Sequence, residues 1–276
     1  MATLFNTSWL TAGQLIDGDK FEALNSPEDK ITYLKTDALL EILKYKCFET
    51  NPKEVCPKEH VLITHNSDYY ISPKTLKFAE TLGLPLHWFA QNVLVQHPKI
   101  TPIPIGLERV RWFPHMRKRD ILLEYMSKID TTPTELCLAN FSLSTTYFQR
   151  KACLDFSCTF STIDVDNSVI QHPYTDFIES VKKHYFVLCP EGNGIDTHRL
   201  WETLYLGRIP IVTNNITVES FKDLPILIIP SWNYLTQDIL INFLKNFQAD
   251  RINYSLEKMN FQYWEKLIRK EIHAKF

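Results

Sequence analysis

The stretch that decides the fold is YFVLCPEGNGIDTHRLWETLYLGRIPIVT, which runs from Tyr185 to Thr213. Its apolar start predicts a buried strand over Tyr185–Cys189, and a loop that contains glycine follows at once. Apolar residues at helical spacing then predict a helix over Thr197–Leu206, and a second apolar run predicts a strand over Ile209–Thr213. A strand, a loop, a helix and a strand in this order are typical of parallel α/β folds.

The loop of this stretch has the features of a phosphate-binding turn. Gly192, Asn193 and Gly194 lie together in a chain that has only 7 glycines, which indicates a backbone with special conformational demands. Asp196 or Thr197 can cap the following helix, whose unpaired N–H groups attract anions. The alternative is a tight strand-to-helix turn without a ligand, because a Gly-x-Gly pair alone is a weak signal.

Two charged side chains of the helix favour a nucleotide diphosphate as the ligand. Arg199 lies in the first turn, where a guanidinium suits a diphosphate, and Glu202 lies one turn later, where a carboxylate suits ribose hydroxyls. A third candidate is Arg150, which follows the first strand of the second half of the chain. The structural alternatives are an exposed ion pair between Arg199 and Glu202 and a solvated helix position for Arg150.

The same alternation of strands and helices extends along the chain and predicts an α/β protein of two facing Rossmann-like domains. A polar segment at 130–134 places the boundary, with a first domain at 1–132 and a second domain at 133–276. Apolar spacing after Pro27 predicts an amphipathic helix that ends near Lys46, and similar spacing over 256–275 predicts a closing helix that can return to the first domain. The other expected strands are 61–64, 86–90, 100–105, 135–140 and 226–229, and the other expected helices are 73–82, 118–128 and 146–156.

Composition excludes several classes of protein. The net charge of -2 gives no basic field for nucleic acid, so no nucleic-acid partner is expected. The N-terminal 20 residues lack the pattern of a signal peptide, and no run approaches the roughly 20 apolar residues of a transmembrane segment. The six cysteines are scattered, without the spacings of a zinc site, which favours reduced thiols and a cytoplasmic location.

Polar residues at the ends of the first-domain strands are candidates for the side of the site that faces the nucleotide, called the acceptor side below. His65, Asn66 and Asp68 follow the strand 61–64, and Asn92 and Glu108 follow the next two strands. Asp68 is the predicted catalytic base with His65 as its fallback, and Asn66, Asn92 and Glu108 are predicted to line the acceptor side. The alternative is ordinary turn and capping chemistry.

The central stretch resembles the donor-binding motif of exostosin-like glycosyltransferases. The matching residues, in order, are Pro190, Gly192, Arg199, Glu202, Gly207, Ile209 and Pro210. Short blocks elsewhere are similar to blocks of bacterial and viral relatives of that family, among them 65–68, 89–92, 104–106 and 140–142 with Arg150.

The resemblance implies a GT-B fold, with the donor held mainly by the C-terminal domain and the acceptor mainly by the N-terminal domain. It also implies no cofactor and no bound metal ion. Retaining enzymes of this fold often carry a first glutamate eight residues before the helix glutamate, whereas Glu191 precedes Glu202 by a longer gap, so inversion is favoured.

The leading interpretation is a glycosyltransferase that moves a sugar from a nucleotide-diphosphate donor to an acceptor hydroxyl of a glycan. The alternative is a non-catalytic module that binds a nucleotide or a glycan on the same fold. An NAD-dependent oxidoreductase is a minor alternative, because neither half shows Gly-x-Gly-x-x-Gly after its first strand.

Overall fold

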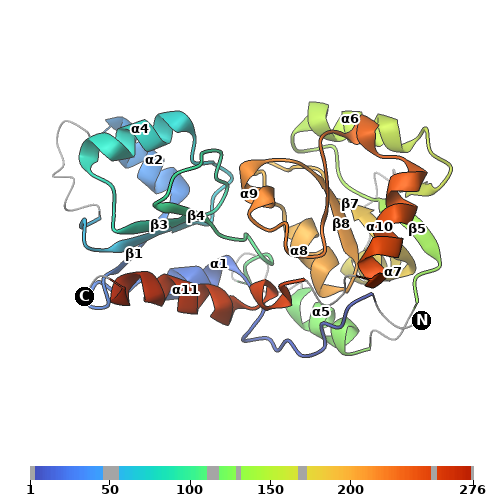
Figure 1. Ribbon diagram of the computed structural model, residues 1–276, viewed down its shortest axis with the longest axis horizontal. Coiled ribbons are helices and arrows are strands. Elements are labelled where there is room, and N and C mark those ends of the chain that lie inside the picture. The colour runs from blue at the N-terminus through green and yellow to red at the C-terminus, as the bar shows by residue number, and fades with distance from the viewer. Residues whose placement is uncertain are drawn as a thin grey trace.

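The computed structural model describes residues 4–45, 56–110, 118–128, 132–166, 173–249 and 254–274. Within these ranges the chain forms two parallel β-sheets flanked by helices, one of four strands and one of five. Figure 1 shows them as two lobes side by side. The lobe with the four-stranded sheet is called the first lobe below, and the lobe with the five-stranded sheet is called the second lobe. The α/β class predicted from the sequence is confirmed.

The first sheet has the strand order β1-β2-β3-β4, and every pair is parallel. Its strands are β1 (Ile31–Lys35), β2 (Val61–His65), β3 (His87–Ala90) and β4 (Ile100–Pro102). All five residues of β2 are buried, as expected for a parallel strand that is covered on both faces. Helices α2 (Thr36–Tyr45) and α4 (Pro73–Leu82) lie above this sheet in Figure 1, and α1 (Gly18–Ala23) lies below it.

Local sequence signals set the ends of α4, which has the bounds predicted for it. Pro73 occupies the first turn, and the Ser72 hydroxyl accepts a hydrogen bond from the Thr75 backbone N–H. Gly83 follows the helix with a φ of 88°, a conformation that favours glycine. Ser72 and Pro73 therefore set the start of α4, and Gly83 sets its end.

The prediction of one helix from Pro27 to near Lys46 is wrong in its first half. A turn at 27–30 leads into β1, and only Thr36–Tyr45 is helical. Lys30 has a φ of 58°, which ends any right-handed helix, and β1 pairs in register with β2 from Ile31↔Val61 onward. Because that partner strand lies about thirty residues further along the chain, helical spacing alone could not reveal it.

The second sheet has the strand order β6-β5-β7-β8-β9, again with parallel pairs. Its strands are β5 (Glu135–Ala139), β6 (Ile163–Val165), β7 (His184–Leu188), β8 (Ile209–Thr213) and β9 (Leu227–Ile229). The chain leaves β5 toward one side to form β6 and then returns to form β7 on the other side. This reversal makes the carboxyl ends of β5 and β7 a topological switch point, where ligands of such sheets bind.

Helices cover both faces of the second sheet. They are α5 (Lys118–Ser127), α6 (Tyr147–Ser157), α7 (Tyr174–Lys183), α8 (His198–Tyr205), α9 (Ile216–Glu219) and α10 (Gln237–Ala249), with short 3-10 turns η2 (Trp232–Tyr234) and η4 (Leu256–Met259). The sequence predicted α5, α6 and α8 to within one or two residues but missed β6, α7, α9 and α10. The predicted boundary at residue 132 lies between the two sheets, while α5, which precedes it, packs against α7 and α8.

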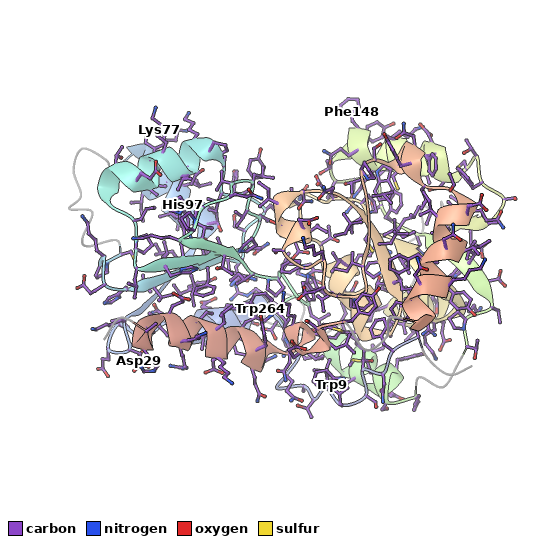
Figure 2. All side chains as sticks on the ribbon, viewed as in Figure 1. Trp9, Asp29, Lys77, His97, Phe148 and Trp264 are labelled. Atoms are coloured by element: carbon purple, nitrogen blue, oxygen red, sulfur yellow. The ribbon has the colours of Figure 1, made fainter. Side chains whose placement is uncertain are left out.

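The two ends of the described chain cross over between the lobes. Near the N-terminus, Phe5 packs against Phe247 of α10 in the second lobe, with ring centroids 6.2 Å apart. The closing helix α11 (Phe261–His273) runs under the first lobe in Figure 1, where Arg269 pairs with Asp29 at 3.6 Å. Trp264 of the same helix, labelled in Figure 2, packs edge-on against Phe221 of the second lobe. The predicted return of the closing helix is therefore confirmed.

Candidate functional site

The switch point of the second sheet brings together the segments after β5 and β7. The Thr146 hydroxyl, from the segment after β5, donates a hydrogen bond to the backbone carbonyl of Gly192, from the loop after β7. Arg150 donates from Nε to the Glu191 carbonyl at 2.9 Å and from Nη1 to the Ser142 carbonyl at 2.7 Å. Two loops that are distant in sequence are thus joined around one guanidinium.

The remaining nitrogen of Arg150 faces the glycine loop. A Cβ placed on Gly192 would lie 3.2 Å from Arg150 Nη2, so glycine leaves open the space beside this nitrogen. Burial lowers the pKa of Arg150, and the positive charge of Arg199 lowers it further. Two guanidinium groups therefore lie close enough to repel each other at this edge of the sheet.

Arg199 is held by an aromatic ring and has an unused donor. Its guanidinium lies over the ring of Phe177 in α7, 4.9 Å from the centroid, and burial lowers its pKa. Its Nη1 atom is buried without a hydrogen-bond partner among the described residues. An unpaired buried donor is costly, and an anion in the crevice would satisfy it.

Helix α8 begins at the same place. Thr197 occupies the N-cap position, as predicted, but its side chain makes no capping hydrogen bond with the described part of α8. The predicted side-chain cap is therefore wrong for Thr197. Its methyl group instead faces Gly192, about 3.8 Å from the position of an added Cβ. The first N–H groups of α8 add their partial positive charge to that of the two arginines.

Glu202 lies one turn into α8, as the sequence predicted, and is paired with a tyrosine. Tyr174 of α7 donates its hydroxyl proton to Glu202 Oε1 at 2.9 Å. Burial, followed by the negative charge of Glu202, raises the pKa of Tyr174. Lys118 lies over the Tyr174 ring, 5.5 Å from its centroid, and pairs with Glu108 at 2.6 Å. This chain of contacts links the helix carboxylate to the acceptor-side residue Glu108.

The acceptor-side candidates lie around a pocket of about 220 Å³. It is lined by Gly18, His65, Asn66, Ser67, Asp68, Gln91, Ile105, Leu107, Glu108, Arg109 and His198. Four of the predicted residues, His65, Asn66, Asp68 and Glu108, are therefore brought together. The one lining residue from the second lobe is His198, at the start of α8.

His65 is enclosed rather than available. Only 1% of it is exposed, and burial lowers its pKa. Nε2 lies 2.9 Å from the Pro104 carbonyl, which can only accept, so Nε2 donates. Nδ1 lies 3.1 Å from Asn66 Oδ1. Both ring nitrogens face oxygen atoms of the protein, which makes His65 a structural support of the pocket.

Asn66 and Asn92 share a local structural role. Each follows a strand with a left-handed backbone, with φ of 58° for Asn66 and 56° for Asn92, a conformation that asparagine tolerates better than most residues. The Asn92 side chain is fully buried, donating to the Ser67 carbonyl at 3.2 Å and accepting from the Asp196 N–H at 3.0 Å. It does not line the pocket, and it joins the two lobes instead.

The glycine loop makes further contacts with the first lobe. Asn193 Nδ2 donates to Asp68 Oδ2 at 3.2 Å, and a Cβ on Gly194 would lie 2.6 Å from Asn92 Nδ2. Gly194 is therefore required by close packing between the lobes, whereas Gly192 faces Arg150. Glycine is therefore needed at these two positions for two different physical reasons.

Four residues of this region were missed as functional candidates: Thr146, Tyr174, Asp196 and His198. Asp196 was considered only as a helix cap. Its carboxylate instead accepts from the Ile105 N–H of the first lobe at 2.7 Å and from Trp201 Nε1 at 3.0 Å. Helical spacing of apolar residues in 174–183 could have revealed α7 and with it Tyr174. His198 directly precedes Arg199, but no sequence pattern shows that its ring crosses to the other lobe.

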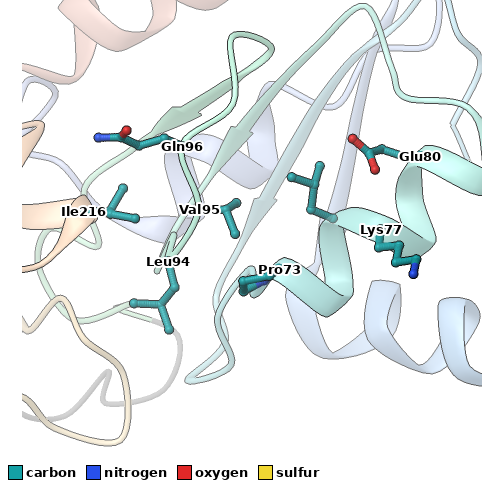
Figure 3. Close-up of a pocket in the computed structure, with 8 residues that line it drawn as sticks. Pro73, Lys77, Glu80, Leu94, Val95, Gln96 and Ile216 are labelled. Carbon is teal, nitrogen blue, oxygen red and sulfur yellow. The ribbon is translucent and has the colours of Figure 1, made fainter.

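A second hollow lies away from these charges. This groove, of about 580 Å³, is lined by Pro73, Leu76, Lys77, Glu80, Leu94, Val95, Gln96 and Ile216. Figure 3 is a close-up of the side chains that line it. The described residues that line it include one cation, Lys77, and no histidine. It is larger than the pocket around Asp68 but lacks convergent polar groups, so we place the candidate site at the switch point.

Two Asp-x-Asp triplets, a spacing that can hold a metal ion, occur in the chain. In the first, Asp17 pairs with Lys20 at 2.9 Å and Asp19 with Arg109 at 2.6 Å. In the second, Asp164 accepts from His184 and Asp166 from Asn140. The part of the chain that the structure describes holds no cluster of three or more metal-ligating side chains.

Neither a protein-family model nor a curated protein sequence matches this chain. Within the described ranges, no helix has the length and apolar character needed to cross a bilayer.

Proposed function

We propose that this protein is a glycosyltransferase of the GT-B architecture, which moves a glycosyl group from a nucleoside-diphosphate sugar to a hydroxyl of a glycan acceptor with inversion. The observation that carries the proposal is the convergence of Arg150 and Arg199 at the switch point. Like charges in a partly buried crevice repel each other unless an anion lies between them. A diphosphate has the charge and the acceptor oxygens that this arrangement lacks.

Each part of the donor has a matching group. The diphosphate would lie between the two guanidinium groups and the start of α8, beside Gly192, where the glycine leaves room. Glu202, one turn further on, accepts hydrogen bonds and suits the ribose hydroxyls. During transfer the bond from the sugar to the diphosphate breaks, and the cations stabilise the charge that develops on the leaving group. No cofactor is required, because the nucleotide sugar is a substrate.

The acceptor has a place on the opposite side. The pocket of about 220 Å³ lies between the first lobe and the start of α8, so an acceptor hydroxyl there would approach from the face remote from the diphosphate. That approach is the one that inversion requires. The carboxylates of Asp68 and Glu108 offer acceptors for sugar hydroxyls.

Nucleotide binding tests the proposal directly. UDP, GDP, ADP, CDP and their common sugar conjugates should be screened for an increase in melting temperature, since a ligand of the native state raises stability by mass action. Arg199→Ala and Arg150→Ala should each weaken binding of the best ligand by at least about tenfold, or about 1.4 kcal/mol. Arg269→Ala removes an arginine from α11, away from the crevice, and should bind as the native protein does.

Transfer must then be measured with the ligand found. Release of the nucleoside diphosphate from its sugar conjugate, with and without mixed oligosaccharides, separates an enzyme from a binding module. Binding without any release would favour the non-catalytic alternative. Equal affinities in the native protein and in Arg199→Ala would remove the basis for the donor site.

A further inference from the structure

We propose that His198 is the catalytic base that removes the proton from the acceptor hydroxyl. This inference rests on the proposed function, and it assigns the base to the second lobe rather than to Asp68. It depends on three observations: where the ring lies, which nitrogen carries the proton, and how the rival groups are occupied.

The ring of His198 lies between the donor crevice and the acceptor pocket. His198 is the first residue of α8 and directly precedes Arg199. Consecutive residues of a helix project about 100° apart, so the two side chains diverge. Arg199 turns toward Phe177 in the second lobe, whereas His198 lines the pocket that holds Asp68 and Glu108. A hydroxyl in this pocket would lie next to the ring of His198. The proposed diphosphate site would be close by, because Arg199 is the next residue of α8.

A single hydrogen bond fixes the tautomer of His198. Nδ1 lies 2.8 Å from the backbone carbonyl of Gly106 in the first lobe. A carbonyl oxygen can only accept, so Nδ1 carries the proton, and the other nitrogen of the neutral ring, Nε2, keeps its lone pair. Nε2 has no hydrogen-bond partner among the residues that the structure places. His198 therefore offers a base whose orientation is fixed by the hydrogen bond from Nδ1 to the Gly106 carbonyl. A catalytic base needs such a second group to hold its ring in place.

The rival groups of the pocket are less suited to this role. Both ring nitrogens of His65 lie against oxygen atoms of Asn66 and Pro104 and not against open space. Asp68 is exposed, and its Oδ2 accepts from Asn193 of the glycine loop, which makes it a contact between the lobes. Glu108 is paired with Lys118 at 2.6 Å. An imidazole is also intrinsically a stronger base than a carboxylate, and its proton affinity is closer to that needed near neutral pH.

The step balances without a further reactant. The acceptor oxygen forms a bond to the anomeric carbon of the donor sugar while the bond from that carbon to the diphosphate oxygen breaks. The electron pair of the broken bond leaves with the nucleoside diphosphate. The hydroxyl proton passes to His198 Nε2 and is released to solvent after the products leave. When water replaces the acceptor, the same base produces donor hydrolysis.

His198→Asn is the informative variant. The Asn amide can donate to the Gly106 carbonyl as Nδ1 does, so the contact between the lobes is kept while the base is lost. We expect release of the nucleoside diphosphate from its sugar conjugate to fall at least about a hundredfold, as for the loss of a general base. Affinity for the nucleoside diphosphate alone should stay within about twofold, because Arg150 and Arg199 are unchanged. In His198→Ala, added imidazole should restore part of the rate.

Two further variants complete the test. His273→Asn, at the exposed end of α11, should behave as the native protein does. Asp68→Asn should lose far less activity than His198→Asn. If His198→Asn stays within about threefold of the native rate, or if Asp68→Asn is the inactive variant, the assignment to His198 is wrong while the proposed function stands. If the native protein binds a nucleoside diphosphate but does not cleave it from any sugar conjugate, the proposed function is wrong. The assignment of His198 as the base is then wrong as well.

Discussion

Asp196 is a buried carboxylate that fixes the start of α8 against the first lobe, and its removal should change how stability depends on pH. Only 2% of the residue is exposed. The carboxylate accepts from the Ile105 N–H at 2.7 Å and from Trp201 Nε1 at 3.0 Å, and His198 is the neighbouring titratable group that acts on it. The perturbation is Asp196→Asn, which keeps the shape of the side chain but cannot ionise.

The magnitude follows from the proton affinity of Asp196. Burial raises the pKa of this carboxyl from an ordinary value of 3.8 to about 6, although its hydrogen bonds act in the opposite direction. The folded protein therefore binds a proton more tightly than the unfolded chain does. The resulting stabilisation is complete below about pH 4 and is lost as pH rises through about 6. The rise of the pKa from 3.8 to about 6 corresponds to about 3 kcal/mol in all, at about 1.36 kcal/mol per pH unit.

Urea unfolding at pH 4, 5, 6 and 7 provides the measurement. The free energy of unfolding of Asp196→Asn is subtracted from that of the native protein at each pH, which cancels the titration of distant groups. Between pH 4 and pH 7 this difference should fall by about 2 kcal/mol of that total, because the unfolded carboxyl is already partly ionised at pH 4. A difference that is constant to within about 0.5 kcal/mol, or that rises with pH, would refute the reasoning.

Three further substitutions test other contacts. Glu202→Gln should lower the preference for ribonucleotides over 2′-deoxyribonucleotides, and an unchanged ratio in calorimetry would contradict the ribose assignment. Gly192→Ala places a methyl group 3.2 Å from Arg150 Nη2, so it should weaken nucleotide binding by about tenfold with little loss of melting temperature. Thr217→Val removes a hydroxyl that bonds both the N–H and the carbonyl of buried Val93 across the lobes, and it should cost about 1–3 kcal/mol in urea unfolding. Native stability in Thr217→Val would show that this bridge between the lobes is dispensable.

The sequence by itself determined the strand–loop–helix–strand unit of 185–213. Its signals are local: apolar runs for buried strands, helical spacing for α8, and glycines where the backbone turns. The same holds for α4, whose Ser72, Pro73 and Gly83 mark its ends. The sequence also placed Arg199 and Glu202 correctly on one helix, because their spacing is a property of the helix alone.

Only the tertiary structure decided which residues meet. β1 was hidden because its pairing partner β2 lies far along the chain, and pairing outweighed the helical spacing near Ile31. The approach of Arg150 to Arg199 depends on the strand order of the second sheet, which no short window contains. His198 became a candidate only when its Nδ1 was found on the Gly106 carbonyl of the other lobe. Periodicity and capping arise from neighbours within a few residues, whereas sheet order and contacts between lobes arise from packing across the whole chain.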